Sequence, residues 1–569
     1  MKNQTKITKE IFLYGIIFFL AGILRFILLG KIPLIESEAS GAFQAWQIWK
    51  GESIRLGSMI GYLSLTEALF SIFGSGNFVA RFWPALVGSF IIWVPYYYRD
   101  RLGRISALVL ASGLALDPAL VSLSRIADSP IPALVFLLLF AAAFHHHRSN
   151  WSLIFLFLAL FSGPAFWFGA VVLGAVLLLS SVFGYLDLKE YVHTKFSDFQ
   201  NNQNKFWSAA GEFFLPMLVV LGIGSFFFSQ YQGLSAWMAS LPEFLMSWIT
   251  PSGVSALAVL AVLALSNPLI NIFGILGFLA AWRQNDQGGK IFSLWFGFSL
   301  LLVLIFPGRE TADLIWVVVP LWVGAAKELV RLFQIAKSSW VVFTLSGMVA
   351  VLITLNWLTL TGMIFQQANQ RAILLQWGLI AASLALALLV MTIVGSEWGW
   401  PSVKKGFAVG SAGMLAVYMF SAMAQGAFLS AGDPKSFWTK ALGSGQVGLL
   451  LDSIKEVSVV ETGRWDSIQG AVINGNATLK WALREFIDIK YYDVYDPSKT
   501  TPVLITREVD NYPVPLNIYR GQDFVISSTP AWTGVIPEDW ISWLAFRDGP
   551  IDRQDIILWV RQDILAGGE

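Results

Sequence analysis

Cysteine is absent from this 569-residue sequence, and histidine occurs only four times. Without thiols the chain cannot form disulfides, thiolate metal sites or a cysteine nucleophile. Charged residues are also scarce, because Asp, Glu, Lys and Arg together make up only 13% of the chain. The formal net charge of +1 therefore points to no particular class of partner.

Hydrophobic residues make up 56% of the sequence, which includes 44 Phe and 25 Trp. Such a composition lies far outside the usual range of soluble domains. Apolar runs of about 17 to 25 residues recur along the chain, the length that a helix needs to cross the roughly 30 Å hydrocarbon core of a bilayer. The first run, residues 11–30, has no small-residue cleavage site behind it, so we expect a retained helix. The sequence thus predicts an α-helical polytopic membrane protein.

Connections that carry Lys or Arg alternate with connections that are mostly poorer in these residues, which orients the chain by the positive-inside rule. This alternation predicts about thirteen transmembrane helices in a multi-pass cell membrane protein whose N-terminus is cytoplasmic. The predicted crossings lie near residues 11–30, 78–97, 104–121, 130–146, 151–164, 166–185, 212–229, 266–283, 291–307, 312–332, 340–362, 374–394 and 406–428.

An odd number of crossings places the tail of the chain outside the cytoplasm. We therefore expect a transmembrane domain over residues 1–429, with an outside loop at 31–77, and a soluble outside domain over residues 430–569. The tail carries 13 basic against 19 acidic residues, a net charge of −6, which argues against nucleic acid as a partner. It alternates β-type and helical runs, which predicts a small α/β domain. These runs are QGAVIN, ATLKWALREF, IKYYDVY, TPVLITRE, QDFVISS and QDIILWVRQDIL.

Two carboxylates, Glu36 and Glu38, follow the first crossing directly, in the segment IPLIESEASGAFQAWQIW. On the outside face they are candidates for a general base. The alternative is a solvated loop in which Ser37 and Glu38 cap the helix that follows. That helix reads as amphipathic and is expected to lie along the membrane interface.

A second charged cluster on the same face is SLSRIADSP, with Arg125 and Asp128 three residues apart. Charges are costly in lipid, so these side chains either pair with each other as a structural salt bridge or point into a water-filled cavity.

A third cluster, FPGRETADLIW, puts Arg309, Glu310 and Asp313 at the mouth of two crossings. Glu310 and Asp313 are alternatively caps of the next helix. Together the three clusters suit an anionic lipid headgroup and a hydroxyl acceptor. A carboxylate takes the acceptor proton, and guanidinium groups stabilise charge on a leaving phosphate.

Four segments, in the same order and on the same membrane side, resemble those of the GT-C superfamily of membrane glycosyltransferases. The likeness is to its branch with protein O-mannosyltransferase-like and aminoarabinose transferase-like members, glycosyltransferase family 39-like. The segments are ESEA at 36–39, LFSIFGSGNFVARFWPALVG at 69–88, SRIADSP at 124–130 and GRETADLIWVVVPLW at 308–322.

The resemblance implies a GT-C fold and transfer of a sugar, with inversion, from a polyprenyl phosphate to an acceptor hydroxyl on the outside face. The acceptor would be a glycan, a lipid or a protein, and membrane lipids would surround the chain. Glu36 or Glu38 would be the base, and Asp128 would orient the acceptor or hold the lipid headgroup region. The residues expected to bind substrate are Arg55, Arg81, Arg125, Arg309, Glu310 and Asp313.

Two departures from the family pattern stand out. The family's catalytic Asp aligns with Ser37, whose hydroxyl cannot replace a carboxylate as a base at neutral pH. The Lys that approaches the lipid phosphate in some members has no counterpart in MIGYLSLTEAL at 59–69, although Arg55 is nearby. The altered acidic pair favours an alternative function, a non-catalytic protein that binds or exports a lipid-linked saccharide.

Part of the tail, KWALREFIDIKYY followed by TPVLITRE, resembles prokaryotic relatives associated with lipid-linked sugar export. A third function, a metabolite transporter, predicts inverted repeats and broken helices in matching halves. We find no clear repeat, although ALSNPLIN at 264–271 is expected to break one helix. A divalent cation is left open as a cofactor, because two carboxylates without a defined spacing are too few to define a site.

Overall fold

The structure is a computed structural model. It describes residues 2–146, 148–187, 206–335, 340–364, 370–425, 438, 442–443, 446–496, 498, 500–510, 512, 514–530 and 551–566. The predicted boundary between the two domains, at 429/430, falls outside the described residues.

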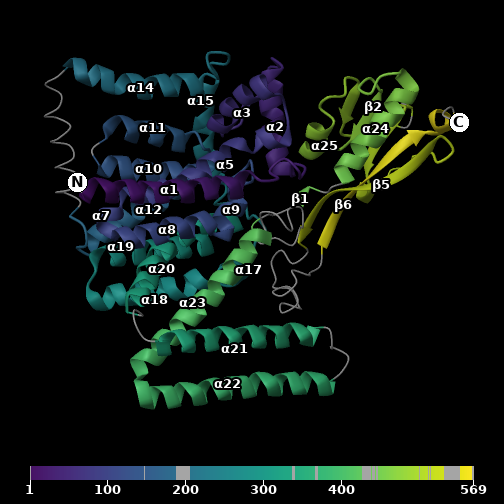
Figure 1. Cartoon of the computed structure of the whole chain (residues 1–569). Coiled ribbons are helices and arrows are strands. Elements are labelled where there is room, and N and C mark those ends of the chain that lie inside the picture. The colour runs from purple at the N-terminus through teal and green to yellow at the C-terminus, as the bar shows by residue number, and fades with distance from the viewer. Residues whose placement is uncertain are drawn as a thin grey trace.

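Each of the thirteen predicted crossings overlaps a helix or a run of helices in the structure, because long apolar runs are a strong local signal. Most of these helices lie side by side in one bundle (Figure 1). They are α1 (Lys2–Phe26), α4 to α6 (Asn77–Ala80, Phe82–Ser89, Trp93–Tyr97), α8 and α9 (Arg104–Leu116, Pro118–Ser124), α10 (Ile131–His145), α11 (Ser149–Leu160), α12 (Pro164–Val182), α14 (Phe206–Gly224), α18 (Pro268–Gln284), α19 (Gln287–Ile305), α20 (Ile315–Ile335), α21 (Trp340–Ile364), α22 (Gln370–Trp398) and α23 (Trp400–Ala424).

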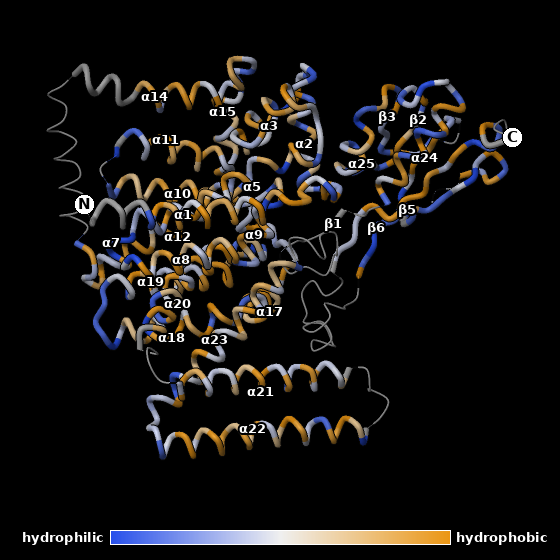
Figure 2. The backbone as a smooth tube through the Cα atoms, in the orientation of Figure 1, coloured by the Kyte–Doolittle hydropathy of each residue, from blue (hydrophilic) through white to orange (hydrophobic). Residues whose placement is uncertain are grey.

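Within the described residues, five helices are long and apolar enough to cross a membrane alone, or up to seven spans if each bent pair counts as one. Several of the others are shorter apolar helices. The number thirteen therefore stays a prediction for membrane crossings. Figure 2 shows hydrophobic residues along the whole length of α21 and α22. Leu374 and Leu388 on α22 are largely exposed, as expected for side chains that face lipid.

Two helices break at a proline inside the bundle. α8 and α9 meet at Pro118 with a bend of 52°, and α17 (Ala256–Ser266) meets α18 at Pro268 with a bend of 91°. Proline has no N–H to donate and disfavours a helical conformation in the residue before it. The break expected in ALSNPLIN at 264–271 is thus confirmed.

A single buried carboxylate joins the two breaks. Oδ2 of Asp117 accepts hydrogen bonds from Nδ2 of Asn267 at 2.9 Å and from Nε1 of Trp322 at 2.8 Å. Its Oδ1 accepts from the first backbone N–H groups of α9, at Ala119 and Leu120. Four donors compensate for taking the carboxylate out of water, so Asp117 fixes α9 against α18 and α20.

Two arginines fix the end of α1 to α8 and α9. Arg25, which is fully buried, donates from Nε to Ser124 Oγ and from Nη1 to the carbonyl of Ala115. In the opposite direction, Nη1 of Arg125 donates to the carbonyls of Leu24 and Arg25. Both side chains satisfy carbonyl groups that helix ends and a proline break leave without partners. The turn after α9 is thereby held against the end of α1.

The loop between α1 and α4 forms two short helices, α2 (Glu36–Trp49) and α3 (Ile60–Phe73). One face of α2 buries small residues, Ala39, Ala42 and Ala45, against α3, as expected of an amphipathic helix. α1 begins at one end of the bundle, and α2 and α3 cover the opposite end (Figure 1). Between α14 and α17 the same end carries α15 (Gly233–Ala236), a 3₁₀ turn and α16 (Ser240–Met246).

The tail forms a mixed six-stranded sheet beside α2 and α3 (Figure 1). The strand order is β1-β5-β6-β4-β2-β3, with β2 parallel to β3 and β4, and β6 antiparallel to β4 and β5. All six runs predicted in the tail lie on its helices and strands, so its α/β character is confirmed. The elements are β1 (Leu442–Gly443), α24 (Gln446–Thr462), β2 (Gly470–Ile473), α25 (Ala477–Ala482), β3 (Ile489–Tyr492), β4 (Val503–Arg507), β5 (Tyr519–Pro530), β6 (Ile551–Arg561) and α27 (Gln562–Ala566).

Candidate functional site

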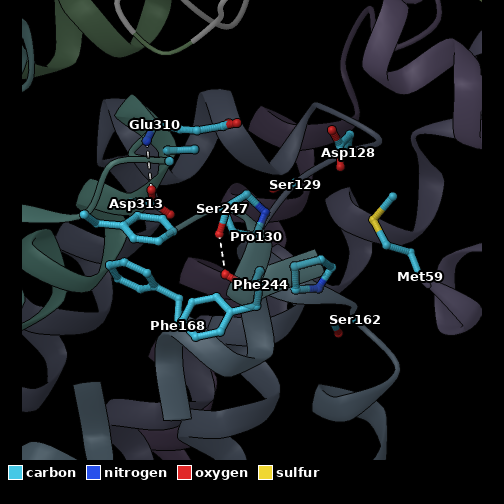
Figure 3. Close-up of a pocket in the computed structure, with 15 residues that line it drawn as sticks. Met59, Asp128, Ser129, Pro130, Ser162, Phe168, Phe244, Ser247, Glu310 and Asp313 are labelled. Carbon is cyan, nitrogen blue, oxygen red and sulfur yellow. Dashed lines mark hydrogen bonds between the residues drawn. The ribbon is translucent and has the colours of Figure 1, made fainter. Parts of the chain in front are cut away.

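A pocket of about 210 Å³ opens at the end of the bundle that α2 and α3 cover. It brings together two of the three predicted clusters, because Asp128 lines it together with Glu310 and Asp313 (Figure 3). The walls come from the start of α3, the turn after α9, the ends of α11 and α12, α16, and the segment between α19 and α20. The other lining residues are Met59, Ser129, Pro130, Ser162, Pro164, Ala165, Phe168, Phe244, Ser247, Phe306, Gly308 and Ala312.

The pocket has carboxylates at its rim and aromatic rings below. In Figure 3, Asp128 lies on one side, Glu310 and Asp313 lie on the opposite side, and Phe168 and Phe244 lie beneath. The ring of Phe244 stacks on that of Phe306, with centroids 5.9 Å apart. Carboxylates accept hydrogen bonds from hydroxyl groups, and aromatic rings bury apolar surface. The lining therefore suits a ligand with hydroxyl groups and apolar faces, such as a sugar.

Glu310 and Asp313 also cap a helix. Asp313 Oδ2 accepts the backbone N–H of Glu310 at 2.8 Å, and Glu310 is the N-cap of the 3₁₀ turn Thr311–Leu314 that leads into α20. The capping alternative is thus confirmed for this pair. Because the cap fixes the backbone at both residues, it also fixes one wall of the pocket.

Glu38 lies elsewhere, buried against Arg81 rather than in the pocket lining. Its carboxylate accepts from Arg81 Nε at 2.7 Å and Nη2 at 2.5 Å, from the N–H of Ala127 at 2.7 Å and from the N–H of Ile35 at 3.1 Å. Only 1% of Glu38 is exposed. The bond to Ile35 is the helix-capping role expected as the alternative, and the bond to Ala127 ties α2 to the turn that carries Asp128.

Arg81 uses every N–H group of its guanidinium on the protein. Besides Glu38, it donates to the carbonyls of Leu29, Ile32 and Pro33 at 2.8 to 3.2 Å. A bidentate ion pair with three further hydrogen bonds leaves no donor for a substrate phosphate in this structure. Arg81 instead shapes the chain between α1 and α2.

The other predicted arginines do not line the pocket either. Arg125 is bonded to the end of α1, as described above, and Arg55 is exposed in the connection between α2 and α3. Arg309 donates from Nη1 to the carbonyl of Val254 at 3.0 Å, while its Nε is buried without a hydrogen-bond partner. The Nε of Arg309 is therefore a buried donor without a hydrogen-bond partner, on a residue whose neighbours Gly308 and Glu310 line the pocket.

Glu36 differs from Glu38 in its exposure and in its hydrogen bonds. It is exposed in the first turn of α2, and among the residues that the structure describes its carboxylate makes no hydrogen bond or ion pair. It does not line the pocket. The two glutamates, two residues apart, therefore have separate structural roles.

Two acidic residues that matter in the structure are missing from the sequence-based candidates. Asp117 is buried in the bundle, and its signal was a carboxylate inside the apolar run LALDPAL. Glu243 lies on α16 beside the pocket-lining Phe244 and accepts a hydrogen bond from Ser58 Oγ at 2.5 Å. The sequence signal for Glu243 was weak, since α16 is short and lies between predicted crossings.

Within the described part of the chain, no three His, Cys, Asp or Glu residues form a group that could hold a metal ion.

No protein-family model and no curated protein sequence matches the chain. Solved structures do match it. ArnT from Cupriavidus metallidurans in the apo state has a TM-score of 0.50 and 14% identity over 98% of each chain, and the same protein bound to undecaprenyl phosphate has a TM-score of 0.49 and 13% identity over 98% of each chain. The archaeal oligosaccharyltransferase AglB from Archaeoglobus fulgidus, in complex with an inhibitory peptide and a dolichol-phosphate, has a TM-score of 0.42 and 12% identity over 88% of this chain and 70% of that one.

The likeness to apo ArnT extends over nearly the whole length of both chains. The chain therefore shares the fold of ArnT, in agreement with the fold that the sequence resemblance predicts.

Proposed function

We propose that the protein is a membrane glycosyltransferase that moves a sugar from a polyprenyl-phosphate donor to an acceptor hydroxyl. The observation that carries this proposal is the pocket, in which Asp128 faces Glu310 and Asp313 above a floor of phenylalanine rings. The fold that the chain shares with apo ArnT also supports the proposal. Glu38 accepts from four donors and neither Glu38 nor Glu36 lines the pocket, so Asp128 is the best placed of the three proposed catalytic carboxylates.

In the proposed reaction, the carboxylate of Asp128 takes the proton of the acceptor hydroxyl. The acceptor oxygen forms a bond to the anomeric carbon, and the bond from that carbon to the phosphate oxygen breaks. The electron pair leaves on polyprenyl phosphate, and the sugar carbon is inverted. Glu310 and Asp313 hold sugar or acceptor hydroxyls, and the unpaired Nε of Arg309 is the donor that we assign to the phosphate.

The test is release of polyprenyl phosphate from a panel of polyprenyl-phosphate sugars by the purified full-length protein in lipid. We expect turnover in the wild type and a loss of about 100-fold or more in Asp128→Asn, the size typical of a lost general base. Asp100→Asn is the matched control, because Asp100 is exposed on α7 (Arg99–Leu102) and does not line the pocket. Full turnover in Asp128→Asn would remove Asp128 from the mechanism.

The alternative function is binding or export of a lipid-linked saccharide without cleavage. One observation favours it, since Ser37 stands where the family has its catalytic Asp, and the neighbouring Glu38 is held by Arg81. Saturable binding of a donor with no release of polyprenyl phosphate, across the whole panel, would support this alternative against the transferase.

The proposed orientation is a multi-pass cell membrane protein with a cytoplasmic N-terminus and the pocket and tail outside. It is supported by the start of α1, which lies at the end of the bundle opposite α2 and α3 (Figure 1), since the pocket lining includes Met59 at the start of α3. A reporter fused near residue 430 that is active only outside the cytoplasm would agree with it, and a cytoplasmic signal would overturn it.

A further inference from the structure

The segment KWALR of the tail contacts the transmembrane part of the chain. It includes the C-terminal end of α25, which packs against α2 beside α3 (Figure 1). Trp481 is only 3% exposed and has two stacking partners, since its ring stacks on Phe70 at 5.8 Å and the guanidinium of Arg484 lies over it at 3.8 Å. Aromatic stacking and cation–π contacts of this kind are directional.

Hydrogen bonds extend this contact to one turn. Trp481 Nε1 donates to Asn77 Oδ1 at 2.9 Å. Arg484 donates from Nε to Ser75 Oγ at 3.2 Å and from Nη2 to the carbonyl of Ser75 at 3.1 Å. Ser75 lies in the turn that joins α3 to α4, and Asn77 is the first residue of α4; Gly74 in the same turn has a φ of +77°, which glycine adopts without strain. The tail thus forms hydrogen bonds with this turn and with the first residue of α4.

Arg484 is mostly buried in this contact, so its charge must be compensated by the protein. Burial lowers the pKa of its guanidinium to about 10, although the neighbouring Glu485 raises it. The side chain still carries its charge at neutral pH, and a buried charge is tolerated only where hydrogen bonds and stacking compensate for lost water. Arg484 also donates to the backbone carbonyl of Trp481 at 2.6 Å, which keeps its guanidinium close to the Trp481 ring.

The turn that Arg484 contacts leads through α4 to the ion pair of Arg81 with Glu38. α4 is followed by Arg81, which donates hydrogen bonds to the carbonyl of Ile32 and to the carboxylate of Glu38. Asn77 itself donates to the carbonyl of Ile32 at 3.5 Å. Glu38 in turn accepts from the N–H of Ala127, the residue before Asp128. An unbroken series of hydrogen bonds therefore runs from the tail to the pocket.

We propose that Trp481 and Arg484 are positioning residues, through which the tail holds the 29–38 segment in place and, through Glu38, the turn that carries Asp128. The tail is then a part of the candidate site rather than an independent module. The geometric part of this inference stands by itself, and only its effect on turnover rests on the proposed function.

The experiment compares the full-length wild type with Trp481→Ala in lipid nanodiscs by hydrogen exchange and by sugar transfer. We expect faster exchange at 29–38 and 74–81, well beyond the mutated helix, because the series of hydrogen bonds is cut. We also expect kcat to fall about tenfold or more with KM little changed, since misplaced groups affect the reacting geometry. Trp465→Ala is the matched control, because Trp465 is a tail tryptophan that is 44% exposed and packs on Phe486.

Two further variants keep the result interpretable. Trp481→Phe retains a ring for Phe70 but removes the N–H that Asn77 accepts, so it separates stacking from hydrogen bonding if Trp481→Ala does not fold. Arg484→Lys keeps the charge and loses the paired bonds to Ser75. Exchange that rises only within 477–486, or equal kcat in Trp481→Ala and Trp465→Ala, would overturn the inference. A wild type that transfers no sugar would refute the proposed function, and the exchange at 29–38 would still decide the positioning role.

Discussion

Glu38 and Arg81 lie 43 residues apart in the chain and form a two-fold ion pair with both side chains buried. Glu38 also holds the turn before Asp128, and Arg81 holds three carbonyls between α1 and α2. The pair therefore connects the segment between α1 and α2 with the residue after α4 and with the turn that carries Asp128. A buried pair of this kind is more sensitive to the loss of one partner than to the replacement of both.

Arg81→Met should destabilise the protein by about 3 to 5 kcal/mol, because it leaves the Glu38 carboxylate buried without its cation. The double variant Glu38→Gln, Arg81→Met should be less destabilised than the single variant. Thermal unfolding of the purified proteins in detergent measures both. A single variant as stable as the wild type would show that the pair is not formed.

Asp117→Ala should cost about 3 kcal/mol or more, because the buried donors of Asn267 and Trp322 lose their acceptor and α9 loses its cap. The same unfolding measurement applies, with Asp100→Ala as an exposed control. Equal melting temperatures for the two variants would contradict the joining role that we assign to Asp117.

Gly277 and Gly324 let α18 and α20 approach closely. A Cβ at Gly277 would collide with the backbone carbonyl of Gly324, whereas a Cβ at Gly297 on α19 would meet nothing within 4 Å. Gly277→Ala should therefore destabilise by about 1 to 3 kcal/mol, and Gly297→Ala should be neutral or stabilise by about 0.5 to 1 kcal/mol through its helix propensity. Opposite shifts in melting temperature are the expected result, and a stabilising Gly277→Ala would show that the two helices are farther apart.

The tail should lose part of its stability in acid through Asp510. Burial tends to raise the pKa of this carboxyl, but hydrogen bonds from Asn474 and Arg507 outweigh it and lower the pKa below the ordinary 3.8. A carboxyl with a lowered pKa in the folded state stabilises the fold above its ordinary pKa and loses this effect as pH falls through the lower value. The contribution is about 0.5 to 1 kcal/mol, since the pair is partly exposed.

Hydrogen exchange of β4 between pH 6 and 3 measures this effect, with Asp510→Asn as the comparison. The wild type should be better protected than the variant at pH 6, and the difference should shrink as pH falls below the ordinary pKa of 3.8. A difference that does not change with pH would exclude Asp510 as its source.

Local sequence signals predicted the helices and strands well, because apolar runs and β-type runs report on burial within one segment. They also brought together Asp128, Glu310 and Asp313 as residues of one candidate site, and these three line the same pocket. The partners of charged side chains could not be predicted in the same way. Asp117 finds Asn267 at a separation of 150 residues, and no local pattern encodes that distance.

The arginines show the same limit. Arg125 was expected either to pair with Asp128 or to face a phosphate, and the structure has it bonded to carbonyls at the end of α1. Carbonyls freed at helix ends compete for guanidinium groups with any ligand, and their positions are known only once the helices are packed.

The two glutamates of the opening segment give the sharpest comparison, because they are two residues apart and differ in burial. Glu36→Gln should change the free energy of unfolding by less than about 0.5 kcal/mol, as is usual for an exposed side chain without partners. Glu38→Gln should lower it by several times as much, since it weakens the bonds to Arg81 and Ala127. Unfolding and polyprenyl-phosphate release are measured on the same preparations. If Glu36→Gln is stable and active while Glu38→Gln loses both properties together, Glu38 acts by holding the site in place. If Glu36→Gln is stable and inactive, the base is Glu36 and the acceptor must approach from the exposed end of α2 rather than from the Asp128 side of the pocket.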